Sequence, residues 1–179
     1  MILDATERLM RREGYGAISA RRVAAEAGLK APLVHYYYRT TDDLLLAFYR
    51  RSAGESRAQM EAALASDRPL RALWDMNSNP ERTALAAEFI ALANHRKIIG
   101  AEIAKHVAAA RALQTAAVAH ALATVESTGE PFDPAVATVL LASIGYGLIL
   151  EAQVGVTEGH AATRAFIEAA IDRIERPVS

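Results

Sequence analysis

Residues 19–51 read SARRVAAEAGLKAPLVHYYYRTTDDLLLAFYRR, and this stretch decides the fold that we expect. Ser19 is a good N-cap for a short helix over 20–27, because its side chain can accept a hydrogen bond from a free backbone N–H of the first turn. Gly28 then ends that helix, since glycine enters the left-handed conformation without steric cost. The stretch therefore begins with a short helix and a tight turn.

A second short helix and the start of a third follow without a gap. Pro32 falls in the first turn of a helix over 31–37, where its missing N–H costs nothing. Thr40 and Asp43 are spaced as a capping box, which predicts a long helix from there to about residue 65. Two short helices around a glycine turn, followed by a longer one, are typical of a helix-turn-helix.

The rest of the chain also predicts helices, and no run alternates apolar and polar residues over a convincing length. A helical stripe near the start is ended by Gly14, and further helices are expected over about 69–76, 80–94, 96–126, 134–156 and 158–176. We therefore expect an all-α fold, with a three-helix head at 1–45 and a larger helical domain at 46–179.

Charge is divided unevenly along the chain, whose net charge is −1. Residues 1–51 hold nine Lys and Arg against six Asp and Glu, whereas the remaining residues hold eleven against fifteen. Five of the six tyrosines also lie in this first third. A basic head on an acidic body is expected when only one end of a protein meets phosphate, and it supports the helix-turn-helix in predicting double-stranded DNA as the partner.

Several classes of site and location are disfavoured by composition. The chain has no cysteine, which excludes disulfides and cysteine-ligated zinc. No charged and then apolar leader opens it, so we expect a cytoplasmic protein. The longest uncharged stretch, 134–150, is short for a membrane span and contains two glycines, so we expect a buried helix and no membrane partner.

The first fifty residues resemble the TetR family of one-component bacterial transcription regulators. The resemblance is carried by Ile2-Leu-Asp-Ala, Gly14-Tyr15, Ser19, Val23-Ala24, Ala27-Gly28, Tyr36-Tyr37-Tyr38 and Asp43-Leu44-Leu45. It implies a helix-turn-helix head, a helical body with a pocket for a small-molecule inducer, and a homodimer formed through the last two long helices. The function it implies is a repressor released from a palindromic operator by a hydrophobic or amphipathic ligand.

Helix-turn-helix geometry assigns candidate DNA contacts in the head. The start of a recognition helix approaches base edges, while flanking groups hold phosphates. Arg21 is the candidate for a guanine contact, and Leu33 and Ala31 suit a thymine methyl. The full predicted set is Ser19, Arg21, Arg22, Lys30, Ala31, Pro32, Leu33, His35, Tyr36, Tyr37 and Thr41.

The body is expected to hold the dimer interface and the ligand. The helix from residue 134 carries no charge until Glu151, and the last helix has an apolar side that includes Ala165, Phe166, Ile171 and Ile174. A mainly apolar pocket with few polar groups suits an apolar ligand. The predicted lining residues are Trp74, Met76, Phe89, Asn94, Ile103, His106, Val107 and Tyr146.

Metal binding and catalysis have little support in the sequence. His95, His106 and His120 would lie roughly 16 and 21 Å apart along one helix, too far to share an ion. No nucleophile–base pair, glycine-rich phosphate loop or zinc motif is present, so we expect no cofactor and no enzymatic activity. A helical-bundle enzyme and a DNA-binding regulator without a ligand remain the alternatives.

Overall fold

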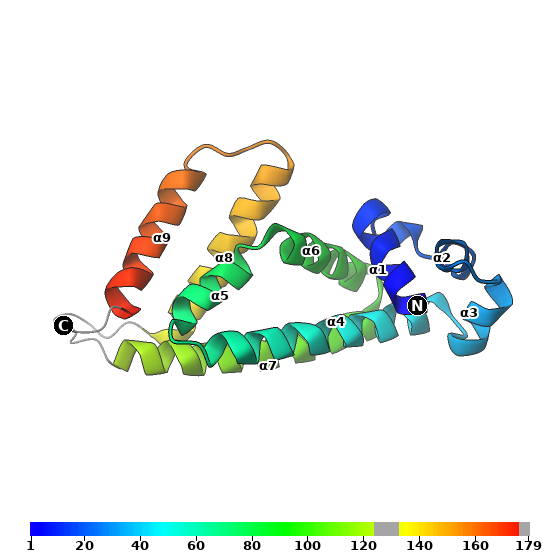
Figure 1. Cartoon of the computed structure of the whole chain (residues 1–179), viewed down its shortest axis with the longest axis horizontal. Helices are drawn as coiled ribbons and strands as arrows, with labels where there is room; N and C mark the ends of the chain where they lie inside the picture. Colours follow the sequence, from blue (N-terminus) through cyan, green and yellow to red (C-terminus); the bar gives the residue numbers. More distant parts are fainter. Residues whose placement is uncertain (124–132, 176–179) are drawn as a thin grey trace. The chain divides into compact units, whose positions relative to one another are not determined.

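The computed structural model describes residues 1–123 and 133–175, and every regular element within those ranges is helical. The elements are α1 (Ile2–Glu13), η1 (Tyr15–Ala17), α2 (Ala20–Ala27), α3 (Ala31–Tyr37), α4 (Thr41–Leu64), α5 (Pro69–Asn77), α6 (Pro80–His95), α7 (Lys97–Ala123), α8 (Pro134–Gln153) and α9 (His160–Glu175) (Figure 1). The predicted all-α fold is confirmed. The end of α7 expected at 124–126 lies outside the described residues.

Short-range capping sets the helix ends in the amino-terminal part, as predicted. The Ser19 hydroxyl accepts a hydrogen bond from the Arg22 N–H at 3.3 Å and so caps α2. Gly28 ends that helix with φ 68° and ψ 29°, in the left-handed region. Thr40 and Asp43 form the expected capping box, in which each backbone N–H donates to the other side chain at 3.0 Å.

Packing divides the chain into two compact units. Unit 1 contains residues 1–56 and 84–107, and unit 2 contains 57–83 together with the described residues from 108 onward. Helices α4, α6 and α7 therefore contribute residues to both units. The functional boundary expected after residue 45 concerns which part binds DNA and stays a prediction, because packing alone does not test it.

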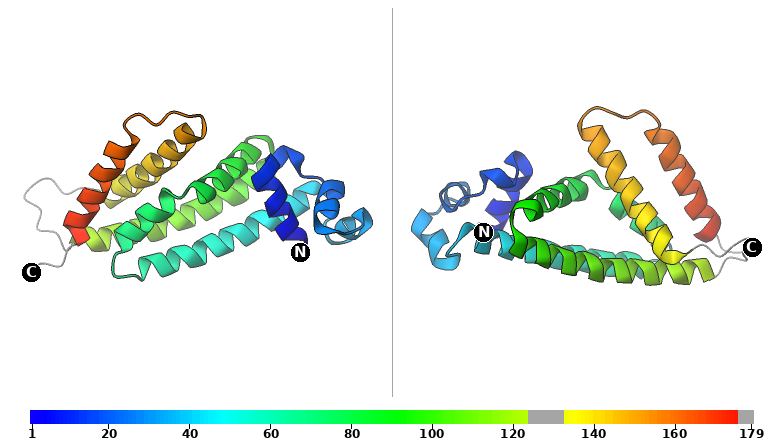
Figure 2. Two further views of the ribbon diagram at one scale, coloured as in Figure 1. Left: turned by 45° about the horizontal axis from the view of Figure 1, so that its top comes forward. Right: turned by 180° about the vertical axis from the view of Figure 1, so that it is seen from behind.

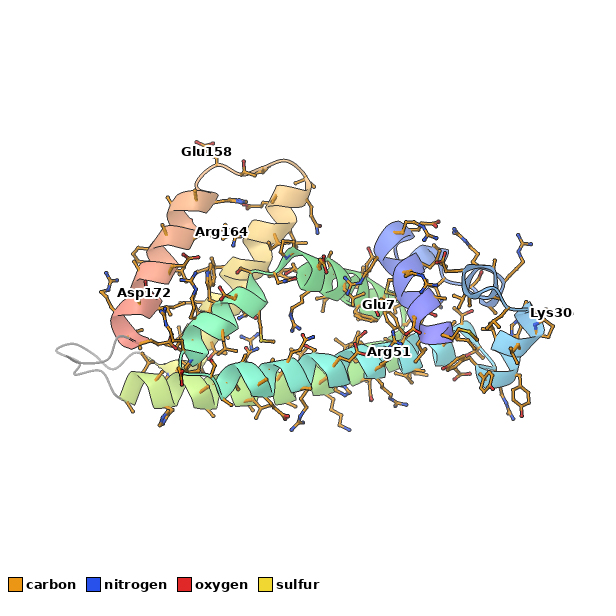
Figure 3. The ribbon with its side chains drawn as sticks, viewed as in Figure 1. Glu7, Lys30, Arg51, Glu158, Arg164 and Asp172 are labelled. Carbon is orange, nitrogen blue, oxygen red and sulfur yellow. The ribbon has the colours of Figure 1, made fainter. Side chains whose placement is uncertain are left out.

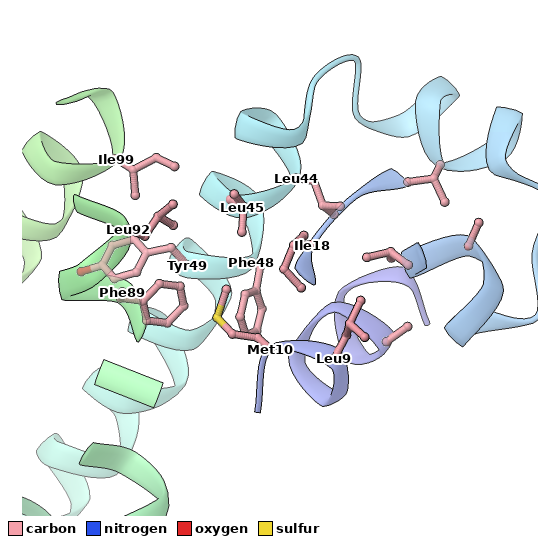
Figure 4. Packing of buried hydrophobic residues seen from close by; sticks show 14 of the residues in the cluster. Leu9, Met10, Ile18, Leu44, Leu45, Phe48, Tyr49, Phe89, Leu92 and Ile99 are labelled. Atoms are coloured by element: carbon pink, nitrogen blue, oxygen red, sulfur yellow. The ribbon is translucent and has the colours of Figure 1, made fainter. Parts of the chain in front are cut away.

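The core of unit 1 joins the three amino-terminal helices to α4, α6 and α7. Phe48 is fully buried, and its ring centroid lies 5.4 Å from that of Phe89 on α6. Tyr49 contacts the same phenylalanine edge-on at 4.9 Å, and burial raises the pKa of Tyr49 to about 12. Figure 4 shows these rings next to Leu9 and Met10 of α1. The helix-turn-helix thus shares one apolar core with α6.

Charged groups also connect the first helix and the loop after it to later helices of unit 1. Arg51 of α4 forms ion pairs with Asp4 and Glu7 of α1, and Figure 3 shows Arg51 beside Glu7. The Glu88 carboxylate of α6 accepts a hydrogen bond from the Tyr15 N–H at 2.7 Å. The loop that precedes α2 is therefore anchored directly to α6.

In unit 2, α5 packs against both α8 and α9, which run in opposite directions and are joined by residues 154–159 (Figure 2). Trp74 of α5 is buried, and its indole N–H donates to Glu168 of α9 at 3.4 Å. Glu175 of α9 accepts hydrogen bonds from the backbone N–H groups of Leu70 and Arg71. These bonds satisfy donors at the start of α5 that have no partner within the helix.

A glycine permits the close approach of α8 to the end of α5. A Cβ atom placed on Gly145 would lie 2.6 Å from the carbonyl oxygen of Asn77 and 2.9 Å from its carbonyl carbon. Real Cβ atoms essentially never come within 3.0 Å of another heavy atom, so a larger residue would force the helices apart. The sequence predicts a buried helix for this apolar stretch but does not identify that contact.

Only part of α8 is buried within the chain. It is long and apolar enough to cross a membrane by length and composition, and 22% of its most apolar window is buried. Val136, Val139 and Leu140, at helical spacing, are exposed apolar residues. Within the described part of the chain, α8 thus keeps an uncovered apolar face.

The predicted apolar side of α9 is divided between two faces. Ile171 is buried and Ile174 packs against the same core cluster of unit 2, so these two do not lie on the exposed side as expected. Ala165 and Phe166 are exposed, and the phenylalanine side chain is 69% accessible. The prediction was wrong in treating them as one surface, because residues five to nine positions apart on a helix need not face the same way.

Candidate nucleic-acid interface

Helix α3 is attached by one side and presents the other to solvent. Val34 is fully buried, and Tyr38, directly after the helix, packs against the core of unit 1. Leu33 is 40% exposed, Tyr36 80% and Tyr37 62%. The two tyrosine rings meet edge-on, with centroids 5.3 Å apart. Large apolar side chains held open in this way form a surface suited to a partner.

Two cations border this surface without partners among the described residues. Arg21 at the start of α2 and Lys30 before α3 are both exposed. Among residues 1–123 and 133–175, neither has an ion pair or a side-chain hydrogen bond. Figure 3 shows Lys30 extending from the head into solvent. Both groups are therefore free to bind a phosphate or a base edge.

Arg22, unlike Arg21, has a carboxylate partner among the described residues. It donates a hydrogen bond to the Glu13 carboxylate at the end of α1, and this contact, with a smaller contribution from Arg12, holds the pKa of Glu13 below its usual value against the opposing effect of burial. A phosphate that bound Arg22 would compete with that carboxylate. Glu13 belongs to the site but was missed from the sequence, because the contact joins two helices across a loop.

A second carboxylate organises the arginines of α1. Glu26 of α2 accepts from the Arg8 Nε at 2.9 Å and from the Arg12 Nη2 at 2.9 Å. These two bonds, that with Arg12 the larger, hold the pKa of Glu26 below its ordinary value of 4.5. The positive charge of Arg8 and Arg12 is thus partly neutralised. Of the basic residues predicted to contact DNA, Arg21 and Lys30 have no ion-pair partner among the described residues.

The remaining predicted DNA contacts lie around the same short helices. Pro32 and His35 are exposed, whereas Ala31 and Thr41 are half-buried. Ser19 is half-buried, and its hydroxyl caps α2. All eleven predicted residues therefore fall on or beside α2, α3 and the start of α4, and their contacts with DNA stay a prediction.

We predict that acid destabilises unit 1. The pKa of Asp4 is lowered from 3.8 to about 2 by the chain amino group and Arg51, and those of Glu13, Glu26 and Glu102 are lowered by arginines. A carboxylate whose pKa is lower in the folded state adds stability above its unfolded pKa and loses it as the pH falls toward the folded pKa. The melting temperature should therefore be constant above pH 4.5 and should fall as the pH is lowered from 4.5 to about 2.

Circular dichroism melts across this pH range would measure the effect. Glu26→Gln should make the pH dependence shallower, because it removes one of the shifted carboxylates. Glu61→Gln is the matched control, since Glu61 forms a single exposed pair with Arg57 on α4. A melting temperature that does not change across the range would contradict the prediction.

The predicted ligand-lining residues are distributed over both units. Phe89, Asn94, Ile103, His106 and Val107 lie in unit 1, and Trp74, Met76 and Tyr146 lie in unit 2. Phe89 and Ile103 belong to the core cluster that includes Phe48. His106 contacts the Tyr49 ring edge-on at 5.5 Å, and its Nδ1 lies 2.9 Å from the Glu102 carbonyl oxygen. Their role in ligand binding stays a prediction.

The three histidines lie on two helices and not on one continuous helix as predicted. His95 is the last residue of α6, and His106 and His120 lie on α7. Among the residues that the structure describes, no group of three or more His, Asp or Glu side chains is placed to hold a metal ion.

A known protein family matches the amino-terminal head of this chain. The model of the bacterial regulatory proteins of the tetR family matches residues 2–48. An uncharacterized HTH-type transcriptional regulator from Haemophilus influenzae is 28% identical over 106 residues, which are 54% of this chain and 57% of that protein. The alignment thus spans little more than half the length of that relative.

Solved structures share the fold over nearly the whole chain. A TetR transcription regulator from Haloarcula marismortui superposes with a TM-score of 0.75 at 24% identity, covering 96% of this chain and 95% of that one. A proposed transcriptional regulator from Saccharomonospora viridis, in complex with choline, gives 0.79 at 18% identity, covering 96% and 93%. At these identities the likeness concerns the fold.

Proposed function

We propose that this chain is a regulator of the TetR family, whose model matches its head, and that it acts as a homodimeric repressor of a palindromic operator. Each head places α3 in the major groove, with α2 against the phosphate backbone and Arg21, at the start of α2, reaching a base edge. Two heads related by a two-fold axis meet half-sites roughly 34–36 Å apart, or a multiple of that distance. The protein acts in the cytoplasm, where bacterial DNA lies.

One observation carries the DNA-binding part of the proposal. The side of α3 away from the core exposes two tyrosines and a leucine, and unpaired Arg21 and Lys30 lie at the starts of α2 and α3. An apolar surface with adjacent free cations matches a duplex, because thymine methyls are apolar and phosphates are anionic. Neither the exposed apolar side chains nor the unpaired cations would stabilise a head that contacts only water.

The dimer is proposed to form through α8 and α9. The exposed apolar residues Val136, Val139 and Leu140 of α8 and Phe166 of α9 lie in unit 2. Against a second copy of the chain, the four helices would bury these side chains in one interface. Such an interface accounts for an apolar helix that its own chain covers only in part.

Release of the operator is proposed to follow ligand binding in the body. A small hydrophobic or amphipathic molecule would favour a conformation in which the two heads are wrongly spaced, which requires unequal affinity for the two states. The hydrogen bond from the Tyr15 N–H to Glu88 gives α6 a direct connection to the loop before α2. The choline complex of the Saccharomonospora protein is a precedent for small-molecule binding on this fold.

Operator selection from random duplexes, followed by binding measurements, tests this function. The selected sequences should contain an inverted repeat, and Arg21→Ala should weaken binding to the best one by about tenfold, because one base contact is lost. Arg57→Ala, which removes an exposed arginine of unit 2, is the matched control and should bind like the wild type. Selection that enriches no repeat would disprove the proposal.

A further inference from the structure

Arg111 lies on the face of α7 that packs into the core of unit 2. Arg111, Gln114 and Val118 are three and four residues apart, so they share one face. Gln114 and Val118 are buried, and Val118 belongs to the core cluster of Met60 and Trp74. The Arg111 side chain therefore starts from a position that leads into this core.

The guanidinium of Arg111 is incompletely satisfied there. Its Nη1 atom is buried from solvent and has no hydrogen-bond partner. Arginine stays protonated in proteins, so this group cannot become neutral to relieve its burial. Arg111 as a whole is half-buried, but the N–H groups of Nη1 are removed from water without a partner, which costs free energy, and native structures normally supply one. Within the part of the chain that the structure describes, Arg111 has no carboxylate partner.

A second donor on the same helix face has only a weak partner. The Gln114 amide Nε2 lies 3.8 Å from the Met60 sulfur, and thioether sulfur is a poor acceptor. Residues three apart on a helix have Cβ atoms about 5–6 Å apart. One carboxylate, with two acceptor oxygens, could therefore take a hydrogen bond from each side chain. A phosphate carries roughly two charges and fits a single guanidinium in apolar surroundings less well.

We propose that unit 2 binds an amphipathic carboxylate, with its oxygens on Arg111 and Gln114 and its apolar part among the neighbouring core side chains. This assignment rests on the proposed function, because it names the chemical class of the ligand that releases the operator. It also separates this chain from the choline-bound relative, since Arg111 repels a quaternary ammonium.

Thermal unfolding of the full chain with ligands of matched tail tests the assignment. The molecules are octanoate, 1-octanol and octyltrimethylammonium, with butyrate and dodecanoate to vary the length. Octanoate should raise the melting temperature most, because only its head group is an anion. Arg111→Met should weaken octanoate binding by about tenfold or more, as expected when a hydrogen bond to a charged group is lost. Gln114→Leu should weaken it less.

The ligand-free variants give an independent readout. Replacing a half-buried arginine whose Nη1 has no partner by an apolar residue of similar size removes the unsatisfied donor, so Arg111→Met should melt at or above the wild type. Arg57→Met, which removes an exposed and paired arginine, should change neither the melting temperature nor octanoate binding.

Three results would overturn the assignment. The first is an equal shift in melting temperature with octanoate, 1-octanol and octyltrimethylammonium. The second is no shift with any of the carboxylates. The third is an Arg111→Met protein that melts at a lower temperature than the wild type or does not fold. Operator binding of the ligand-free wild type and Arg111→Met separates this assignment from the proposed function. If the wild type selects no operator, the regulatory proposal fails while the octanoate result still decides the binding site.

Discussion

Phe166→Glu is expected to leave the protein monomeric and to weaken operator binding roughly a hundredfold, because two linked heads gain 10²–10⁴ in avidity over one. Phe166 is 69% exposed on α9 and lies in the proposed dimer interface. A carboxylate at that position would be buried between two apolar helices without a partner, which costs more than the lost contact alone. The fold of each chain should be retained, since the side chain has few contacts within its own chain.

Analytical ultracentrifugation and anisotropy with the selected operator would measure the two effects together. Ala161→Glu is the control, because Ala161 is exposed on the same helix and lies five residues before Phe166, on a different face. It should remain a dimer with unchanged operator affinity. A dimeric Phe166→Glu protein would disprove this interface, and a monomeric one with full affinity would disprove the requirement for two heads.

Gly145→Ala is expected to lower the free energy of unfolding by about 2 kcal/mol, in the range typical of overpacked sites. The added methyl would lie 2.6 Å from the Asn77 carbonyl oxygen, so α8 and the end of α5 must separate. Backbone atoms cannot move aside as the end of a flexible side chain can. The loss should exceed the gain of about 0.5–1 kcal/mol that alanine brings over glycine in a helix.

Gly147→Ala is the matched control for this substitution. A Cβ atom at Gly147 meets no atom within 4 Å, so only the gain in helix propensity applies and the variant should be more stable than the wild type. Urea unfolding followed by the fluorescence of Trp74, the single tryptophan of the chain, reports on the same unit. Equal stabilities of the two variants would show that the close approach does not restrict this position.

Local chemistry made the amino-terminal part predictable. A serine before a helix, a glycine after it and a threonine–aspartate pair each bind backbone groups within a few residues, so their positions in the sequence determine the helix ends. Ser19, Gly28, and Thr40 with Asp43 all take the expected conformation.

Contacts between distant helices could not be predicted in the same way. The pairing of Arg22 with Glu13 depends on how α1 and α2 cross, and the contact of Gly145 with Asn77 on how α8 meets α5. A list of apolar residues likewise does not tell a pocket wall from a core. Phe89 was a candidate for ligand contact, yet it packs against Phe48 in the core that supports the helix-turn-helix.

The carboxylates beside the arginines of the head have a consequence for how operator binding responds to ionic strength. Arg22 is already neutralised by Glu13, so when it moves to a phosphate and a cation leaves the DNA, the freed carboxylate attracts a cation in its place. Arg21 and Lys30 have no such internal counterion among the described residues. The slope of log affinity against log salt therefore counts only the unpaired cations, and it should understate the number of phosphates that the dimer contacts.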